Sequence, residues 1–206
     1  MTVYFLLFIA GMGGLLYGYD IGIIGTALLY LDKCVRLSEA EVSVLASAVM
    51  GGSLVSSLVA GALADWLGRK RVMIAASLLF VVSAALIVTS HGFAPLLLGR
   101  TLQGLCAGMV AVVIPIYLAE SVPAETRGRG ATAFQLFITL GLAGAMGAGA
   151  WYQAGAEKAV LAAAGNADGI LAAQDNAWRQ MFLTSAYPSL VFLLGMMFVH
   201  ELFSDN

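Results

Sequence analysis

The sequence predicts an all-α membrane protein with six transmembrane helices, and two observations support this fold class. Hydrophobic residues make up 61% of the chain and charged residues only 11%, whereas a soluble domain carries charge every few positions. Apolar stretches of about 20 residues, enough for a helix to cross a bilayer, recur along nearly the whole chain. We expect a single bundle over residues 1–206, with helices at about 3–28, 42–64, 72–90, 95–118, 131–151 and 178–200.

Composition also excludes several classes of function. The net charge is −2 and basic residues cluster only in the hairpins between helices, so nucleic acid is not an expected partner. The two cysteines, Cys34 and Cys106, fall in an expected loop and in the middle of an expected helix, which is typical neither of a disulfide framework nor of a metal site. The sequence has no nucleophile with a neighbouring base and no pair of catalytic carboxylates. We therefore expect no enzyme activity, no metal and no cofactor.

The first two expected helices, 3–28 and 42–64, each carry small residues at every fourth position. These are Ala10, Gly14, Gly18, Gly22 and Thr26 in the first helix, and Ala48, Gly52, Ser56, Ala60 and Ala64 in the second. Small side chains let a neighbouring helix approach closely, and such packing stabilises helix pairs in a membrane. Ser38 and Glu41 have the spacing of a capping box and predict the start of the second helix.

A short charged hairpin at 61–71, GALADWLGRKR, separates the second expected helix from the third. Its cations Arg69, Lys70 and Arg71 indicate that the hairpin is cytoplasmic, because short loops rich in Lys and Arg stay on that side. The N-terminus is then cytoplasmic as well. The third helix, 72–90, is uniformly apolar, and we expect it to pack against lipid.

Two opposite charges fall inside expected helices. Asp20 lies about two turns from the outer end of the first helix, and Arg100 about two turns from the outer end of the fourth. A charge at membrane depth is unfavourable unless it has a partner, so we predict that the two side chains interact and that Asp20 is a proton or ligand site. Two alternatives stay open: Asp20 is wetted at the membrane surface, or Arg100 extends to the outer headgroups.

The fifth expected helix, 131–151, is rich in Gly and Ala and contains one amide, Gln135. That amide can donate and accept, which suits a sugar hydroxyl or, equally, a bond to a neighbouring helix. An Ala-rich segment at 153–176 has too little hydrophobic length to span a membrane, and we expect a mobile loop there. The sixth helix, 178–200, is expected to start with Trp178 at the membrane interface.

Four ordered motifs carry a resemblance to a known family. The hairpin resembles G-x-x-x-D-R-x-G-R-R/K, the loop between the second and third helices of the major facilitator superfamily, although Trp66 replaces the usual cation. The matching residues there are Gly61, Asp65, Gly68, Arg69 and Lys70. GYDIGIIG at 18–25, PIYLAESVPAETRGRG at 115–130 and QLFITLG at 135–141 resemble the first, fourth and fifth helices of its sugar porter branch. By spacing alone, the hairpin also fits a generic cytoplasmic turn in which Gly68 stops the helix.

This resemblance implies that the chain is the amino-terminal half of a major facilitator fold, a 3+3 inverted repeat of two three-helix units. It implies transport of a sugar or a similar small polar solute, by alternating access with proton symport. Asp20 and Arg100 would then serve proton coupling, and Gln135 would contact the substrate. An inner gating network would comprise Gly61, Asp65, Gly68, Arg69, Lys70, Glu120, Glu125 and Arg127.

The resemblance also implies a location and partners. We expect a multi-pass protein of the inner (plasma) membrane whose partners are the sugar, the proton and the lipid bilayer. Since the site of such transporters lies between two halves, a carboxy-terminal six-helix half or a second copy of this chain is expected too. Family members continue from the sixth helix into P-E-S-P-R-W-L, whereas this sequence has His200 and Glu201 at that point and then diverges. The alternative is therefore a truncated membrane fragment that transports nothing.

Overall fold

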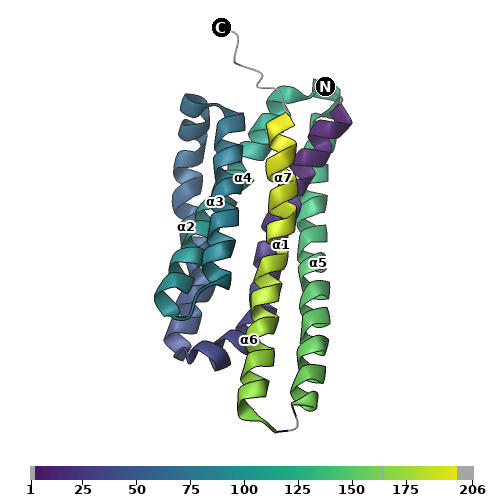
Figure 1. Ribbon diagram of the computed structural model, residues 1–206. Helices are drawn as coiled ribbons and strands as arrows, with labels where there is room; N and C mark the ends of the chain where they lie inside the picture. The colour runs from purple at the N-terminus through teal and green to yellow at the C-terminus, as the bar shows by residue number, and fades with distance from the viewer. Residues whose placement is uncertain (1–2, 164, 199–206) are drawn as a thin grey trace.

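The computed structural model describes residues 3–163 and 165–198, and within them every regular element is helical. Six segments of this part of the chain are long and apolar enough to cross a membrane, the last of them formed by two helices together. This confirms the prediction of an all-α protein with six transmembrane helices. The helices, drawn in Figure 1, are α1 (Val3–Val35), α2 (Glu39–Leu67), α3 (Arg69–Val88), α4 (Phe93–Ser121), the 3-10 helix η1 (Ala124–Thr126), α5 (Arg127–Ala162), α6 (Ala167–Thr184) and α7 (Ala186–Phe198).

The boundaries of α2 follow from local chemistry. Ser38 Oγ accepts a hydrogen bond from the Glu41 N–H at 3.3 Å, and the Ser38 N–H donates to Glu41 Oε2 at 2.8 Å, which is the predicted capping box. Gly68 alone separates α2 from α3, with a φ of 90° and its N–H donating to the Ala64 carbonyl at 3.1 Å. Glycine adopts this conformation without the strain that a side chain would add, so Gly68 ends one helix and starts the next.

The prediction of a mobile loop at 153–176 is wrong. α5 continues to Ala162 and α6 starts at Ala167, so both helices extend past the others at the end of the bundle opposite the start of α1 and the end of α7 (Figure 1). Alanine has the highest helix propensity, and it keeps this segment helical although the segment is not apolar enough to cross a membrane alone. The turn between the two helices contains Gly165, with a φ of 84°, and Asn166, which caps α6.

The last expected helix also differs from the prediction. A turn at Ser185 divides it into α6 and α7, because Pro188 has no N–H with which to continue the hydrogen-bond ladder. Trp178, expected at the membrane interface, is fully buried in the core, since α6 starts well before it and carries it into the bundle. Residues 199 and 200, where we expected this helix to end, lie outside the described residues.

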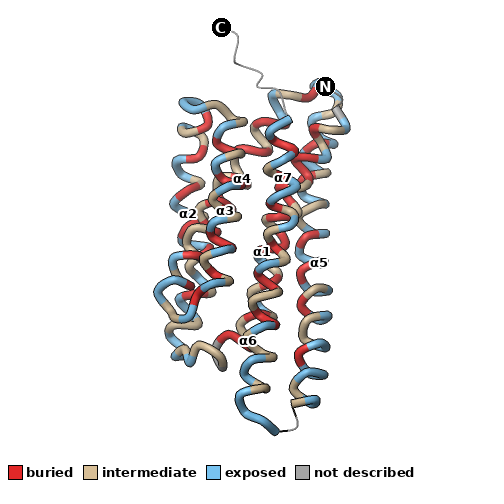
Figure 2. The backbone as a smooth tube through the Cα atoms, in the orientation of Figure 1, coloured by how far each residue is buried: buried red, intermediate tan, exposed pale blue. Residues whose placement is uncertain are grey.

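The stripes of small residues lie at helix contacts, as predicted. α1 packs along α5, where a Cβ on Gly14 would lie 2.7 Å from the Phe134 carbonyl oxygen. α2 packs along α4, where a Cβ on Gly52 would lie 2.6 Å from the Thr101 carbonyl oxygen. Figure 2 shows the buried residues along the faces where the helices meet. These helix pairs approach as closely as glycine allows.

The expectation that the third helix packs against lipid is wrong for one of its faces, which lies in the core. Phe80 and Ile87 on α3 are almost completely buried, and the helix packs against α4 and α7. Leu78 and Val82 are exposed on the same helix. α3 therefore has one face in the core and one face on the outer surface of the bundle.

The pattern of helix contacts agrees with an inverted repeat. An inverted repeat pairs α1 with α4, α2 with α5, and α3 with the α6–α7 segment. The α1–α5 contact then corresponds to the α4–α2 contact, and both contacts are extensive. Two sets of hydrogen bonds between α3 and the α6–α7 segment, which we call cross-links, are also related by this repeat. Lys70 Nζ at the start of α3 donates to the Met197 carbonyl near the end of α7 at 3.4 Å, and Arg179 in α6 donates to the Val88 and Ser90 carbonyls at the end of α3. The first cross-link lies at the end of the bundle that holds the α2–α3 turn, which we call the hairpin end, and the second at the opposite, far end.

Candidate functional site

An ion pair between α1 and α4 lies inside the bundle. Arg100 Nη1 donates to Asp20 Oδ1 at 3.0 Å, and the two residues are only 3% and 0% exposed. The prediction that they interact is confirmed. Their burial excludes both alternatives, because Arg100 does not extend to the headgroups and Asp20 is not wetted at the surface.

Two further side chains hold Arg100, and the sequence interpretation missed both. Gln103 Oε1 accepts from the same Arg100 Nη1 at 2.7 Å, and the ring centroid of Phe182 on α6 lies 5.5 Å from Arg100 Cζ. Gln103 follows Arg100 by three positions on α4, a spacing that places two side chains on one face of a helix. That spacing was the available signal for Gln103, whereas nothing in the sequence indicated Phe182.

The site has unused polar atoms and one group that can change charge. Asp20 Oδ2, Arg100 Nε and Gln103 Nε2 are buried and have no hydrogen-bond partner among the described residues. A guanidinium keeps its proton in proteins, whereas a carboxylate can accept one. A cavity of about 10 Å³, about the room needed by one water, is lined by Asp20, Tyr17 and Cys106 among others. The geometry can therefore hold or release one proton at Asp20.

Gln135 lies apart from this ion pair. It is exposed on α5, and its side chain makes no hydrogen bond to any residue within 3–163 and 165–198. The alternative that it bonds a neighbouring helix is therefore not seen in this part of the chain. Its amide is accessible to a ligand.

A second arginine gathers carboxylates at the hairpin end. Arg69 Nη2 lies 2.6 Å from Asp65 Oδ1, and Arg69 Nε and Nη2 donate to the two Glu120 carboxylate oxygens at 3.0 and 3.1 Å. Arg69 Nη1 also donates to the Ala64 carbonyl at 3.1 Å. This cluster joins the α2–α3 turn to the end of α4.

The other residues of the expected gating network are dispersed. Gly61 has open space around it, Gly68 forms the α2–α3 turn, and Lys70 bonds the end of α7. Glu125 and Arg127 are exposed at η1 and the start of α5, and neither forms an ion pair with any residue that the structure describes. Three of the eight expected residues, Asp65, Arg69 and Glu120, are thus brought into one cluster.

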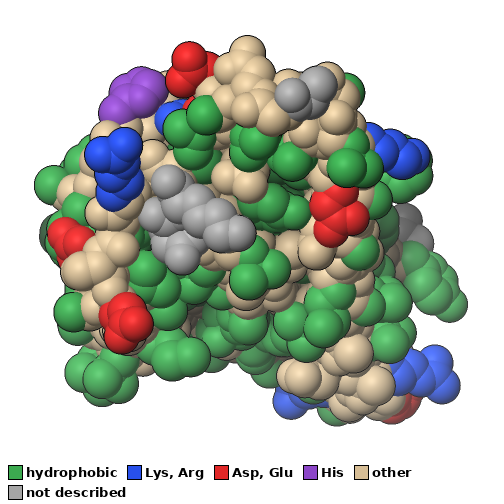
Figure 3. Space-filling model, turned by 90° about the horizontal axis from the view of Figure 1, so that it is seen from below, with side chains coloured by type: hydrophobic (Ala, Val, Ile, Leu, Met, Phe, Trp, Pro, Cys, Tyr) green, Lys and Arg blue, Asp and Glu red, His purple; other side chains and the backbone are tan. Residues whose placement is uncertain are grey.

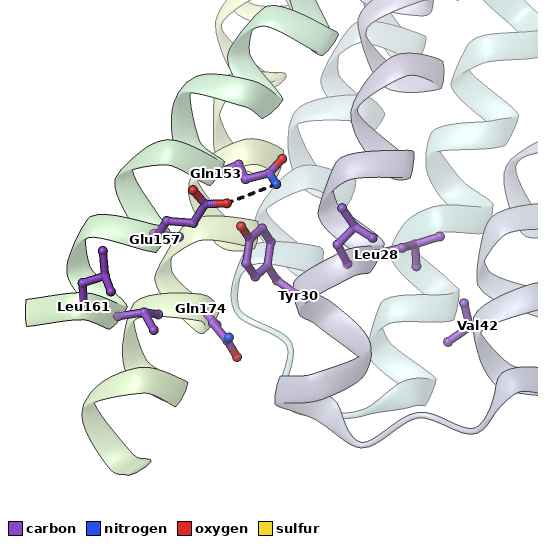
Figure 4. A pocket seen from close by; sticks show the side chains of 10 residues that line it. Leu28, Tyr30, Val42, Gln153, Glu157, Leu161 and Gln174 are labelled. Carbon is purple, nitrogen blue, oxygen red and sulfur yellow. Dashed lines mark hydrogen bonds between the residues drawn. The ribbon is translucent and has the colours of Figure 1, made fainter. Parts of the chain in front are cut away.

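A pocket of about 810 Å³ lies at the far end, about 15 Å along α1 from Asp20. Figure 4 shows the Tyr30 ring on α1 directed toward Gln153 and Glu157 on α5, which are linked at 3.5 Å. Figure 3 shows this end of the molecule, where charged side chains are scattered among hydrophobic ones instead of forming one patch. The pocket was not expected because the sequence interpretation placed a loop where α5 and α6 form its wall.

The comparison with known families covers nearly the whole chain. A model of the family described as "Sugar (and other) transporter" matches residues 6–202. The chain belongs to this sugar transporter family. The family consists of transporters, which agrees with the expectation of no enzyme activity.

Relatives in the sugar transporter family are much longer than this chain. The glucose transporter GlcP of Staphylococcus epidermidis is 33% identical over 198 residues, which cover 96% of this chain and 40% of that protein. The proton myo-inositol cotransporter hmit-1.1 of Caenorhabditis elegans is 31% identical over 204 residues, which cover 98% of this chain and 31% of that protein. The chain spans less than half the length of these two relatives.

Solved structures show the same fold. The major facilitator superfamily proton:xylose symporter XylE, bound to 6-bromo-6-deoxy-D-glucose, superposes with a TM-score of 0.80 at 22% sequence identity, over 97% of this chain and 45% of that one. The inward-open xylose transporter XylE from E. coli superposes with a TM-score of 0.78. Both the family and the major facilitator fold predicted from the sequence are confirmed.

Proposed function

We propose that this member of the sugar transporter family forms one half of a proton-coupled transporter of a sugar or a similar small polar solute. The observation that carries the proposal is the buried pair of Asp20 and Arg100, in which only Asp20 can change charge. Two similar proteins support proton coupling. One relative is a proton myo-inositol cotransporter, and one structural neighbour is a proton:xylose symporter.

Protonation of Asp20 is the step that we assign to the ion pair. It removes the negative partner of Arg100 and so weakens the contact between α1 and α4. A ligand shifts a conformational equilibrium only as far as its affinities for the two states differ. Coupling therefore requires that the protonated and ionised forms of Asp20 favour different arrangements of these helices.

Other residues complete the proposed transporter. Gln135 would contact the substrate, since its amide is accessible and can both donate and accept. The cluster of Asp65, Arg69 and Glu120 would latch the inner gate, and the remaining residues proposed for that gate are Gly61, Gly68, Lys70, Glu125 and Arg127. The cations of the α2–α3 turn favour a cytoplasmic hairpin end, hence a cytoplasmic N-terminus in the plasma membrane.

A second half would supply the other wall of the path. The chain covers 40% of the GlcP relative, which leaves the larger part of such a protein unmatched. We propose that the partner is a carboxy-terminal six-helix half or a second copy of this chain. In either case the substrate would lie between the two bundles.

The test is uptake of labelled hexoses, pentoses and inositol into proteoliposomes that contain the full chain, with and without an imposed proton gradient. If a second copy of the chain forms the other half, we expect gradient-driven accumulation of at least one solute. In the active assembly, we expect Asp20→Asn to abolish accumulation while sparing exchange. Glu157→Gln makes the same chemical change in the far-end pocket and should accumulate solute normally. Accumulation by Asp20→Asn at the level of the unmodified chain would contradict the coupling role.

The alternative of a non-transporting fragment predicts a different outcome. A folded chain that takes up none of these solutes is then mixed with the separately expressed carboxy-terminal half of the GlcP relative. Transport restored by mixing supports the half-transporter proposal. Continued inactivity of the mixed, folded pair supports the fragment.

A further inference from the structure

Gln103 binds the Arg100 guanidinium independently of Asp20. The Arg100 Nη1 atom donates to Gln103 Oε1 at 2.7 Å and to Asp20 Oδ1 at 3.0 Å, so one nitrogen has two acceptors. Because a guanidinium only donates, the amide must present its oxygen to Arg100, and the amide nitrogen Nε2 is left without a partner among the described residues. Gln103 is itself completely buried.

The two acceptors lie on different helices. Arg100 and Gln103 are both on α4, whereas Asp20 is on α1. When Asp20 takes up a proton, the buried guanidinium keeps its charge and loses its counter-charge, which is unfavourable unless another acceptor remains. Gln103 Oε1 is that acceptor, and the Phe182 ring covers the guanidinium from α6.

We propose that Gln103 is a positioning residue that keeps Arg100 bound to α4 while Asp20 takes up and releases a proton. The proton then changes only the contact between α1 and α4, and Arg100 does not move into the space around the site. This inference rests on the proposed role of Asp20. It adds that Gln103 stays bound to Arg100 while Asp20 is released from it.

Few other groups near Asp20 can titrate. Cys106 on α4 and Tyr17 on α1 line the small cavity beside Asp20, and Tyr19 is its chain neighbour. α3 contributes Phe80 to that cavity, which cannot titrate. These side chains are a thiol and phenols, not carboxyls, so the carboxyl component that Asp20→Asn removes reports on Asp20.

The test is an infrared titration of the full chain in lipid, which follows the absorption of protonated carboxyl groups as pH changes. The Asp20 component is the part that Asp20→Asn removes. We expect Gln103→Leu to move its midpoint to lower pH by about one unit, a tenfold loss of proton affinity, because a protonated Asp20 then leaves Arg100 without an acceptor. We expect Gln103→Glu to move the midpoint to higher pH by about one unit, because a second carboxylate would neutralise Arg100 in place of Asp20.

Opposite shifts in these two variants identify the acceptor role, since a merely structural role would not reverse sign with the charge of the side chain. Gln153→Leu, the same substitution at the far-end pocket, should leave the midpoint unchanged. An Asp20 midpoint unmoved in both variants, or moved the same way in both, would overturn the inference while leaving the proposed coupling intact. Conversely, opposite shifts together with the failure of every uptake assay would retain the inference and remove the proposed function.

Discussion

Two arginines each hold carboxylates across helix boundaries, but in opposite surroundings. The Arg100 and Asp20 side chains are only 3% and 1% exposed. The Arg69 side chain is 20% exposed, and its partners Asp65 and Glu120 are 70% and 31% exposed. An arginine bound to carboxylate therefore occurs once inside the bundle and once at its hairpin end.

The difference teaches how each cluster responds to the loss of one charge. The buried pair has a single carboxylate, and both side chains are shielded from bulk solvent, so removal of either charge leaves the other uncompensated. The hairpin-end cluster has two carboxylates and a backbone carbonyl on one guanidinium, and solvent screens the two carboxylates. A single proton can neutralise the carboxylate of the first cluster, whereas the second is held by several weak contacts, as the proposed latch would be.

The largest expected effect comes from Arg100→Leu. Asp20 is left as a buried carboxylate without a counter-charge, and breaking such a pair costs about 3 to 5 kcal/mol of unfolding free energy. The loss should shrink as pH falls, because protonation of Asp20 removes the uncompensated charge. Thermal unfolding in detergent, measured across a range of pH, checks both the size and the sign.

The matched control is the double variant Asp20→Asn with Arg100→Leu, which has no buried charge at this site. It should lose much less stability than Arg100→Leu alone and show no such pH dependence. Strict additivity of the two single substitutions would mean that the residues do not interact, and the contrast with Arg69 would then fail.

The next effect concerns the helix contact that supports the ion pair. Gly18 lies two positions before Asp20 on α1, and a Cβ added there would overlap the Ile138 carbonyl of α5. A Cβ added at Gly25 would meet nothing within 4 Å. Gly18→Ala should destabilise the chain by about 1 to 3 kcal/mol. Gly25→Ala should be neutral or stabilise by up to about 1 kcal/mol, since alanine favours helix over glycine. Equal unfolding temperatures for the two variants would show that the close approach of α1 and α5 is not needed.

The parts of the fold that the sequence predicted are those that depend on one helix at a time. Long apolar stretches gave the number of helices, and small residues at every fourth position gave the faces that pack. Asp20 and Arg100 were paired because each lies at a similar depth, and depth follows from position along a helix with a fixed rise per residue. Their contact needed no knowledge of side-chain packing.

The parts that the sequence did not predict depend on several helices or on a balance of preferences. Phe182 meets Arg100 only because α6 turns one particular face inward, which its own sequence does not specify. The low hydrophobicity of the segment at 153–176 predicts a loop, whereas alanine propensity keeps the segment helical. The turn at Ser185 has a local signal in Pro188, which lacks the N–H needed to continue the helix.

The smallest expected effect comes from Arg69→Gln at the hairpin end. Exposed ion pairs contribute about 0 to 1 kcal/mol, so the unfolding free energy should change by no more than that. The change should also diminish as salt is added, because exposed charges are screened over about 10 Å at moderate ionic strength. Unfolding in detergent at low and high salt measures this, with Arg127→Gln as the matched control, since Arg127 has no ion pair among the described residues.

Arg69→Gln also tests why the two arginines differ. If it costs as much stability as Arg100→Leu and the cost does not depend on salt, burial is not what separates the two clusters, and the hairpin end is part of the rigid core. If its cost is small and disappears in salt, as we expect, the cluster of Asp65, Arg69 and Glu120 can open at little cost. The proposed latch would need that property because it would release in every transport cycle, whereas the proposed coupling requires the buried pair to stay closed until Asp20 receives a proton.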